Sequence, residues 1–207
     1  MPGITSVAQE FADFAAWLGE KSPEKIQRIG TLNNGFEGWL KLEFFFWLTS
    51  HRQEMLRSAG SDDDADVGLE YNLRRDQRHP ALDRESNRSD LWIRDSQGSR
   101  FHYVELKAPF ANLNEVKVLT SVGNGFWHMA RIRKASERAA SGNAVVLGVS
   151  FDEERWRDCI NRVRHYADLP VDTVLSGEGV LGRDGLVRWC VLTKVYGGDN
   201  GKPNSCE

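Results

Sequence analysis

The chain has 207 residues, of which 28% are charged and 40% hydrophobic, and its formal net charge is −3. This length fits one domain whose core needs neither disulfides nor a structural metal. The small net charge excludes a basic footprint over the whole chain, and the longest continuous apolar run, 44–48, is far too short to cross a membrane.

The hydrophobic pattern predicts helices and strands in an order that suits a mixed sheet covered by helices. Apolar residues at helical spacing predict helices over 6–20, 35–52, 121–140 and 152–167. Alternating or continuous apolar runs predict strands over 68–75, 89–94, 101–107, 144–151 and 187–196, the first three as a meander. The sequence therefore predicts an α/β domain over 1–196, with a mixed β-sheet of about five strands flanked by helices. Residues 197–207, rich in Gly and Asn, predict a flexible tail.

Residues 89–107 carry an acid on one predicted strand and an acid with a lysine on the next. Glu105 and Lys107 are two residues apart, so they project from the same side of a strand, about 6.5 to 7 Å from each other. A hairpin would bring Asp90 alongside them. Two close carboxylates are costly unless a cation lies between them, and Mg²⁺ prefers such oxygen ligands. The same pattern also fits a surface hairpin with a Glu–Lys ion pair.

The helix expected over 35–52 places an acid in apolar surroundings. At about 100° per residue, an apolar arc forms that has Glu43 near its middle. The residues of this arc are Phe36, Trp39, Leu40, Phe46 and Trp47. A buried carboxylate needs a partner, a metal or a proton, so Glu43 is predicted as a third acid of the site, with an ion pair to an arginine as the alternative. Glu37 is interpreted as a solvated residue near the helix start.

In this order, Glu43, Asp90, Glu105 and Lys107 resemble the signature of the PD-(D/E)XK nuclease superfamily, which has the restriction-endonuclease-like fold. The likeness lies in the runs W-L-x-x-E at 39–43, D-L-W-I at 90–93 and V-E-L-K at 104–107. It covers roughly 33–110 by motif and extends to about 196 by the order of elements. Ser89 stands where the name has proline, a position often lost in the superfamily.

The resemblance implies a metal-dependent endonuclease that hydrolyses phosphodiester bonds of nucleic acid, DNA before RNA, in restriction, repair or phage defence. Asp90, Glu105 and Glu43 would hold Mg²⁺, or Mn²⁺ in its place, with the backbone carbonyl of Leu106 as a further ligand. Lys107 would lower the pKa of metal-bound water and stabilise charge developing on the phosphate.

Local basic segments are the first candidates for phosphate contacts, although they also fit solvated loops. The expected nucleic-acid-binding residues are Arg74, Arg75, Arg78, Arg84 and Arg88. With little room for a recognition domain, we expect loops, a second copy of the chain or a larger complex to supply specificity.

Two further patterns bear on nucleotide cofactor binding and on the cellular location. Gly177, Gly179 and Gly182 spell G-x-G-x-x-G, but Gly185 breaks any following helix, so a hairpin or loop is expected and no nucleotide cofactor. The three cysteines are widely spaced, and MPGITSVAQEF lacks the features of a secretory signal. Both observations favour a cytoplasmic protein without membrane association.

Two other classes of function fit the sequence less closely. A catalytically silent module of the same fold would bind nucleic acid or protein without cleaving. An unrelated α/β scaffold with a chance D…ExK pattern would bind a protein partner. The feature that this alternative explains worst is the position of Glu43 in an apolar arc.

Overall fold

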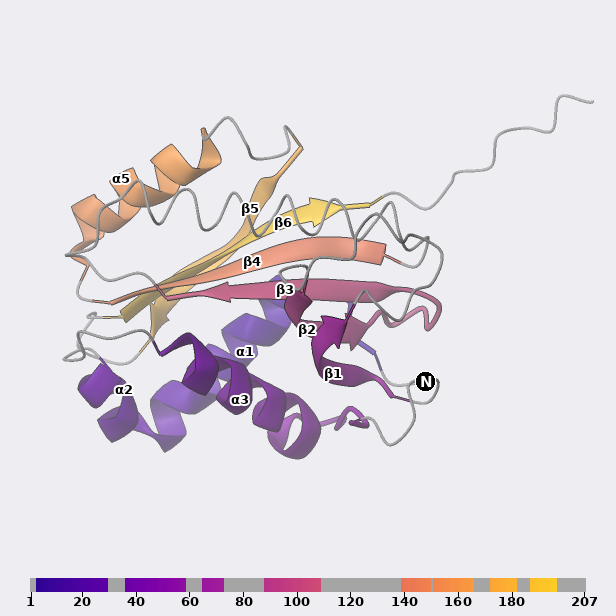
Figure 1. Cartoon of the computed structure of the whole chain (residues 1–207). Coiled ribbons are helices and arrows are strands. Elements are labelled where there is room, and N and C mark those ends of the chain that lie inside the picture. The colour runs from indigo at the N-terminus through magenta and orange to yellow at the C-terminus, as the bar shows by residue number, and fades with distance from the viewer. Residues whose placement is uncertain are drawn as a thin grey trace, which may run out of the picture.

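A mixed sheet of six strands forms the centre of the part of the chain that the computed structural model describes (Figure 1). The described residues are 3–29, 36–58, 65–72, 88–108, 139–149, 151–165, 172–181 and 187–196, without the side chains of 70–72, 88 and 164. Helices lie on both faces of this sheet, so the predicted α/β class is confirmed.

The strands follow one another in the order β1-β2-β3-β4-β6-β5 across the sheet. Their bounds are β1 Val67–Asn72, β2 Arg88–Arg94, β3 Phe101–Lys107, β4 Ala139–Val149, β5 Val174–Leu181 and β6 Val187–Val195. The pairs β1–β2 and β2–β3 are antiparallel, which confirms the predicted meander, and β3 pairs with β4 in parallel. The pairs β4–β6 and β5–β6 are antiparallel, so the sheet is mixed and has six strands, where about five were predicted.

Gly177 and Gly179 of the G-x-G pattern lie in the edge strand β5, which pairs with β6, and Gly182 lies outside the described residues. Gly177 and Gly179 lie beneath the indole ring of Trp189. A Cβ atom at Gly179 would come within 2.9 Å of that ring, closer than real Cβ contacts allow. Packing against Trp189 therefore accounts for Gly179, whereas a Cβ atom at Gly177 would lie 3.2 Å from Ala8 and 3.4 Å from Trp189.

The described helical segments divide between the two faces of the sheet (Figure 1). On the first face lie α1 Val7–Lys21, α2 Pro23–Ile29 and α3 Glu37–Phe46, which continues into the π-helical turn η1 Trp47–His51; α5 Glu153–Arg164 lies on the second face. These bounds confirm the helices predicted over 6–20, 35–52 and 152–167, whereas α2 was not predicted. Most of the helix predicted over 121–140 lies outside the described residues, and 139–140 belong to β4. None of the described helices is long and apolar enough to span a membrane.

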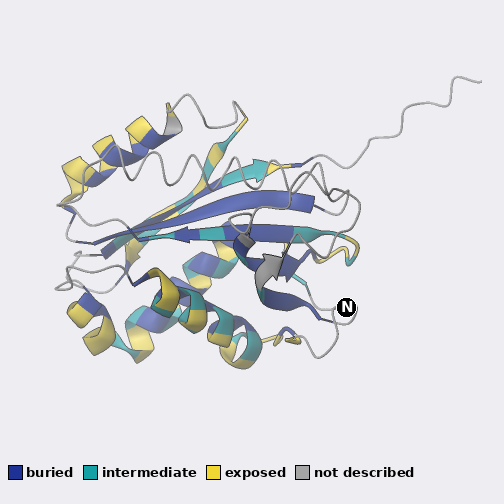
Figure 2. Cartoon of the chain, in the orientation of Figure 1, coloured by how far each residue is buried: buried dark blue, intermediate teal, exposed yellow. Residues whose placement is uncertain are grey.

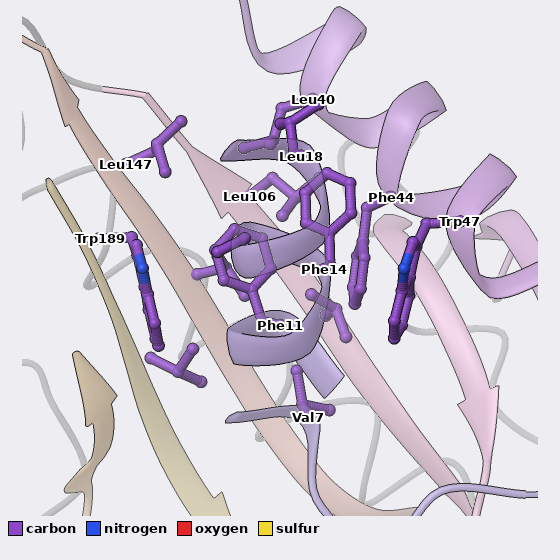
Figure 3. Packing of buried hydrophobic residues seen from close by; sticks show 14 of the residues in the cluster. Val7, Phe11, Phe14, Leu18, Leu40, Phe44, Trp47, Leu106, Leu147 and Trp189 are labelled. Atoms are coloured by element: carbon purple, nitrogen blue, oxygen red, sulfur yellow. The ribbon is translucent and has the colours of Figure 1, made fainter. Parts of the chain in front are cut away.

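Aromatic side chains from α1, α3 and β6 meet in the core of the first face (Figure 3). The Phe44 ring lies with its centroid 5.3 Å from that of Phe11 and 5.1 Å from that of Phe14, and Trp189 contacts Phe11 from the sheet. The outward side of α3 carries exposed residues (Figure 2). Phe46 is one of them, with 58% of its surface exposed. The predicted arc therefore placed Phe46 on the wrong face of the helix.

Register along β3 divides its side chains between the two faces of the sheet. Leu106 pairs with Val145, which belongs to the core under α1 and α3. Glu105 pairs with Ala144, which belongs to the core under α5. The predicted alternation of β3 is thus confirmed: Glu105 and Lys107 share one side of the strand at its C-terminal end, and Leu106 lies on the other.

Buried polar side chains connect β3, β4 and the N-terminal segment. His102 Nε2 lies 3.2 Å from the carbonyl oxygen of Ile4, and Nδ1 lies 2.7 Å from Ser141 Oγ. Because a carbonyl only accepts, neutral His102 carries its proton on Nε2, and the Ser141 hydroxyl donates to Nδ1. Asn143 Nδ2 in turn donates to Ser141 Oγ over 2.8 Å. These partners explain why β4 begins earlier than its apolar run, since Ser141 and Asn143 are buried among polar groups.

We expect the free energy of unfolding to fall between pH 7.5 and pH 6 because of His102. Burial lowers the pKa of His102 below its usual value, and this effect outweighs the opposing influence of Asp95. The unfolded chain then binds the proton more readily than the folded protein. The contribution of His102 to the free energy of unfolding is therefore complete above the unfolded pKa of about 6.5 and is lost as the pH falls below it. The slope from one proton cannot exceed about 1.4 kcal/mol per pH unit. Urea unfolding at several pH values measures it, and His102→Gln should flatten the slope; an equal slope in that variant would contradict the assignment.

Candidate functional site

The strands β2 and β3 separate at the point where the two predicted acids meet. Their paired residues run from Arg94 with Phe101 to Leu91 with Val104. One step beyond, the backbone N–H of Leu106 donates to Asp90 Oδ2 over 2.8 Å. A side-chain carboxylate thus takes the place of a strand partner at Leu106.

Glu105 and Lys107 form an ion pair beside Asp90. Lys107 Nζ lies 2.8 Å from Glu105 Oε1, and the two side chains are only 15% and 16% exposed. A second lysine, Lys41 of α3, lies with Nζ 3.5 Å from Asp90 Oδ1. The structure therefore brings together Asp90, Glu105 and Lys107, as the sequence predicts, and adds Lys41.

The acids of this group lie close enough to influence one another's ionisation. Burial raises the pKa of Glu105 above its usual value; Asp90 and Glu37 add to the rise, and Lys107 opposes it. Burial acts to lower the pKa of Lys107, but the carboxylates around it, Glu105 foremost, raise it above the usual value overall. Lys107 is therefore an ammonium at neutral pH. A further positive charge nearby would stabilise the ionised form of Glu105.

Glu37 is the acid of α3 that reaches this group. Its Oε1 accepts the backbone N–H of Ala108 over 3.1 Å, and its Oε2 lies 3.9 Å from Lys107 Nζ. The sequence interpretation of Glu37 as a merely solvated residue was incomplete: its side chain is 47% exposed, yet it contacts the end of β3. Glu37 and Lys41 are four residues apart, so they lie on the same flank of the helix.

Glu43 does not join this group, which corrects the sequence prediction. Its Oε1 accepts a hydrogen bond from Lys25 Nζ of α2 over 2.8 Å. The buried side of α3 centres on Leu40 and Phe44, and at about 100° per residue Glu43 lies roughly 160° around the helix from Lys41. Glu43 is thus held in an ion pair, the alternative considered above, with a lysine in place of an arginine.

The oxygen atoms around Asp90 suit a hard divalent cation in kind. Asp90 and Glu105 offer carboxylates that are 25% and 16% exposed, with Glu37 nearby. Since the N–H and C=O groups of one strand residue point to the same side, the carbonyl of Leu106 faces the Asp90 side as its N–H does. Within the described ranges, however, no three His, Cys, Asp or Glu side chains already form a metal-binding group. Lysines now pair with Asp90 and Glu105, so an ion would have to displace at least one of them.

The arginines predicted to contact phosphates cannot be placed relative to this group. Arg74, Arg75, Arg78 and Arg84 lie outside the described residues, and of Arg88 only the backbone in β2 is described. Their role stays a prediction.

Comparisons with protein-family models, curated proteins and solved structures find no match to this chain. Its function is therefore argued from the arrangement of its own residues.

Proposed function

We propose that the chain is a divalent-metal-dependent phosphodiesterase of the PD-(D/E)XK type that cleaves nucleic acid internally, DNA before RNA. The observation that carries this proposal is the meeting of Asp90, Glu105 and Lys107 where β2 and β3 separate. A helix acid, Glu37 in place of the predicted Glu43, lies at the same strand end. The mixed sheet with its opening meander supports a restriction-endonuclease-like fold for the domain.

Asp90 and Glu105 would hold Mg²⁺ or Mn²⁺ through carboxylate oxygens, with the Leu106 carbonyl as a further ligand. A bound ion would supply a water of lowered pKa and a positive charge for the phosphate oxygens. Lys107, protonated because of its raised pKa, cannot take up a proton at neutral pH. Its ammonium would instead donate hydrogen bonds to phosphate oxygens as charge develops on them. Glu37 contacts Lys107 and the end of β3, and would hold the ammonium in position.

The proposed partners are those expected from the sequence: DNA, and a second copy of the chain or a larger complex that supplies specificity. The arginines of the 74–88 segment are proposed to contact phosphates without reading sequence. A cytoplasmic location fits a substrate of this kind.

Incubating the purified chain with a panel of nucleic acids tests the proposal. Plasmid, linear and branched DNA and RNA are each incubated with Mg²⁺, with Mn²⁺ and with EDTA. We expect cleavage of at least one substrate, dependent on the ion and leaving 5′-phosphates. Binding without cleavage under all conditions would point to a silent module of the same fold. Neither binding nor cleavage would favour the unrelated scaffold.

Two acids of α3 provide a matched pair for locating the site. Glu37→Gln should reduce cleavage by about ten-fold or more, because Lys107 loses one of its two carboxylate neighbours. Glu43→Gln, which removes the same charge from the same helix but on the opposite flank, should leave cleavage within about two-fold of wild type. Single-turnover rates at saturating Mg²⁺ measure both. A larger loss from Glu43→Gln than from Glu37→Gln would restore Glu43 as the helix acid.

A further inference from the structure

Lys41 occupies one oxygen of the Asp90 carboxylate from the side of α3. Its Nζ lies 3.5 Å from Asp90 Oδ1, and its side chain is 18% exposed. The other oxygen, Oδ2, accepts the N–H of Leu106 over 2.8 Å. A cation that approaches Asp90 would therefore meet Lys41 at Oδ1.

We propose that Lys41 is the internal counter-ion of the metal site, which a divalent cation must displace from Asp90 before it can bind. This inference rests on the proposed function, because it takes Asp90 to be a metal ligand. It assigns to Lys41 a role distinct from that of Lys107: Lys41 sets how tightly the ion is held.

The two lysines of the site are held to different extents. Lys107 contacts Glu105 at 2.8 Å and has Glu37 at 3.9 Å, so two carboxylates hold its ammonium. Lys41 meets Asp90 at the longer distance of 3.5 Å, from a flexible four-carbon stem on the flank of a helix. Of these two ion pairs, the one between Lys41 and Asp90 is the longer, so a cation that binds Asp90 replaces the weaker contact.

Charge repulsion makes this movement necessary. A magnesium ion binds a carboxylate oxygen at about 2.1 Å. An ammonium within hydrogen-bond range of the same oxygen would then lie only a few ångströms from a doubly charged ion, in a site partly shielded from water. The ion and Lys41 thus compete for Asp90, and removing the ammonium favours the ion.

In the ion-free protein Lys41 has the opposite effect. Asp90 accepts the N–H of Leu106, the neighbour of Glu105 in β3, and Glu37 lies 3.9 Å from Lys107, so three carboxylates gather at this strand end and repel one another. An ammonium on Asp90 offsets part of this repulsion. Lys41 would therefore stabilise the empty site and weaken the filled one, so that cation binding depends on the concentration of the free ion.

Calorimetric titration of the whole chain with Mn²⁺, in the absence of nucleic acid, tests the proposal. Lys41→Gln should bind Mn²⁺ about ten-fold more tightly than wild type, equivalent to about 1.4 kcal/mol. Lys41→Arg, which keeps the charge, should bind with an affinity closer to that of wild type. The matched control is Lys25→Gln, which removes a lysine from an ion pair with Glu43 on the opposite flank of α3 and should leave the affinity unchanged.

Thermal unfolding with and without Mn²⁺ gives a second readout. The increase in melting temperature that Mn²⁺ produces should be larger for Lys41→Gln than for wild type, because stabilisation by a ligand follows its affinity. A purely structural role of Lys41 would instead weaken binding when the lysine is lost. If Lys41→Gln does not fold, Lys41→Met, whose stem packs like that of lysine, takes its place.

The outcomes separate this inference from the proposed function. If wild type binds Mn²⁺ and Asp90→Asn does not, the metal site stands; unchanged or weaker binding by both neutral Lys41 variants would then overturn the role of Lys41 alone. If neither wild type nor the Lys41 variants bind Mn²⁺, the metal site itself is wrong, and the proposed function fails with it.

Discussion

Replacing Lys107 by alanine should lower the rate of cleavage by a factor on the order of 10² to 10³, the size found when one donor to a developing negative charge is removed. The Lys107 ammonium is paired with Glu105, and its raised pKa keeps it charged at neutral pH. Its loss removes positive charge where the phosphate would react but takes away no ligand of the ion. Single-turnover cleavage at saturating Mg²⁺ measures the effect.

Metal binding by the same variant distinguishes this role from that of a ligand. Lys107→Ala should bind Mn²⁺ at least as tightly as wild type, because it loses a cation and keeps Asp90 and Glu105. The fold should persist, since the Lys107 side chain lies at the end of β3 and belongs to none of the apolar cores. A loss of Mn²⁺ binding together with activity would show that Lys107 shapes the site and does not act on the phosphate.

Phe44→Ala should destabilise the protein by about 3 to 5 kcal/mol, the usual cost of removing a buried phenylalanine. Phe44 is fully buried, and its ring contacts Phe11 and Phe14 of α1 as well as Trp47 (Figure 3). The free energy of unfolding of a small domain is only about 5 to 15 kcal/mol, so this loss would leave the variant only marginally stable. Urea unfolding at pH 7.5 measures the change.

A second phenylalanine on the same helix is the control for Phe44. Phe46 is 58% exposed, so Phe46→Ala should change the free energy of unfolding by no more than about 0.5 kcal/mol. Equal losses from the two variants would mean that the buried side of α3 is assigned wrongly, and with it the flank on which Glu37 and Lys41 lie.

The strand part of the site could be predicted from the sequence because alternation in a strand depends on local geometry. Side chains two positions apart in a strand point to the same side, so Glu105 and Lys107 had to lie together. The meander then brought Asp90 within reach, since antiparallel neighbours with a short turn pair in register. The side chain of Asp90 bonding to Leu106 N–H depends on where the two strands separate, and no local pattern indicates that point.

The helix acid predicted from the sequence, Glu43, differs from the one that lies at the end of β3, Glu37, because α3 is apolar nearly all round. Trp39, Phe45 and Phe46 lie on its other sides, and periodicity alone cannot tell which side meets the sheet. Packing into the core of the first face decides it, by burying Leu40 and Phe44. One local signal was present: Glu37 and Lys41 are an acid and a base four residues apart, a spacing that places both on one flank.

The strand β5 and the start of β4 were not predicted as strands, because their residues are stabilised by contacts with other parts of the chain. β5 has glycines in its interior, and the close approach of the Trp189 ring explains Gly179. The start of β4 contains Ser141 and Asn143, which become suitable for burial through His102 and its neighbours. Polar and glycine-rich segments of this kind are predicted as loops from the sequence, because their hydrogen-bond and packing partners come from other parts of the chain.

Asp90 and Glu105 are proposed to form a metal site that hydrolyses phosphodiester bonds. The most direct test of this proposal compares wild type with Asp90→Ala in Mg²⁺-dependent cleavage of DNA, with both proteins purified identically and a contaminating nuclease excluded. The variant loses a ligand and one negative charge from the site, so its cleavage should fall by several orders of magnitude. DNA binding should survive or tighten, because repulsion between the carboxylate and the phosphates is relieved. Cleavage by Asp90→Ala at the wild-type rate, with the ion present, would contradict the account.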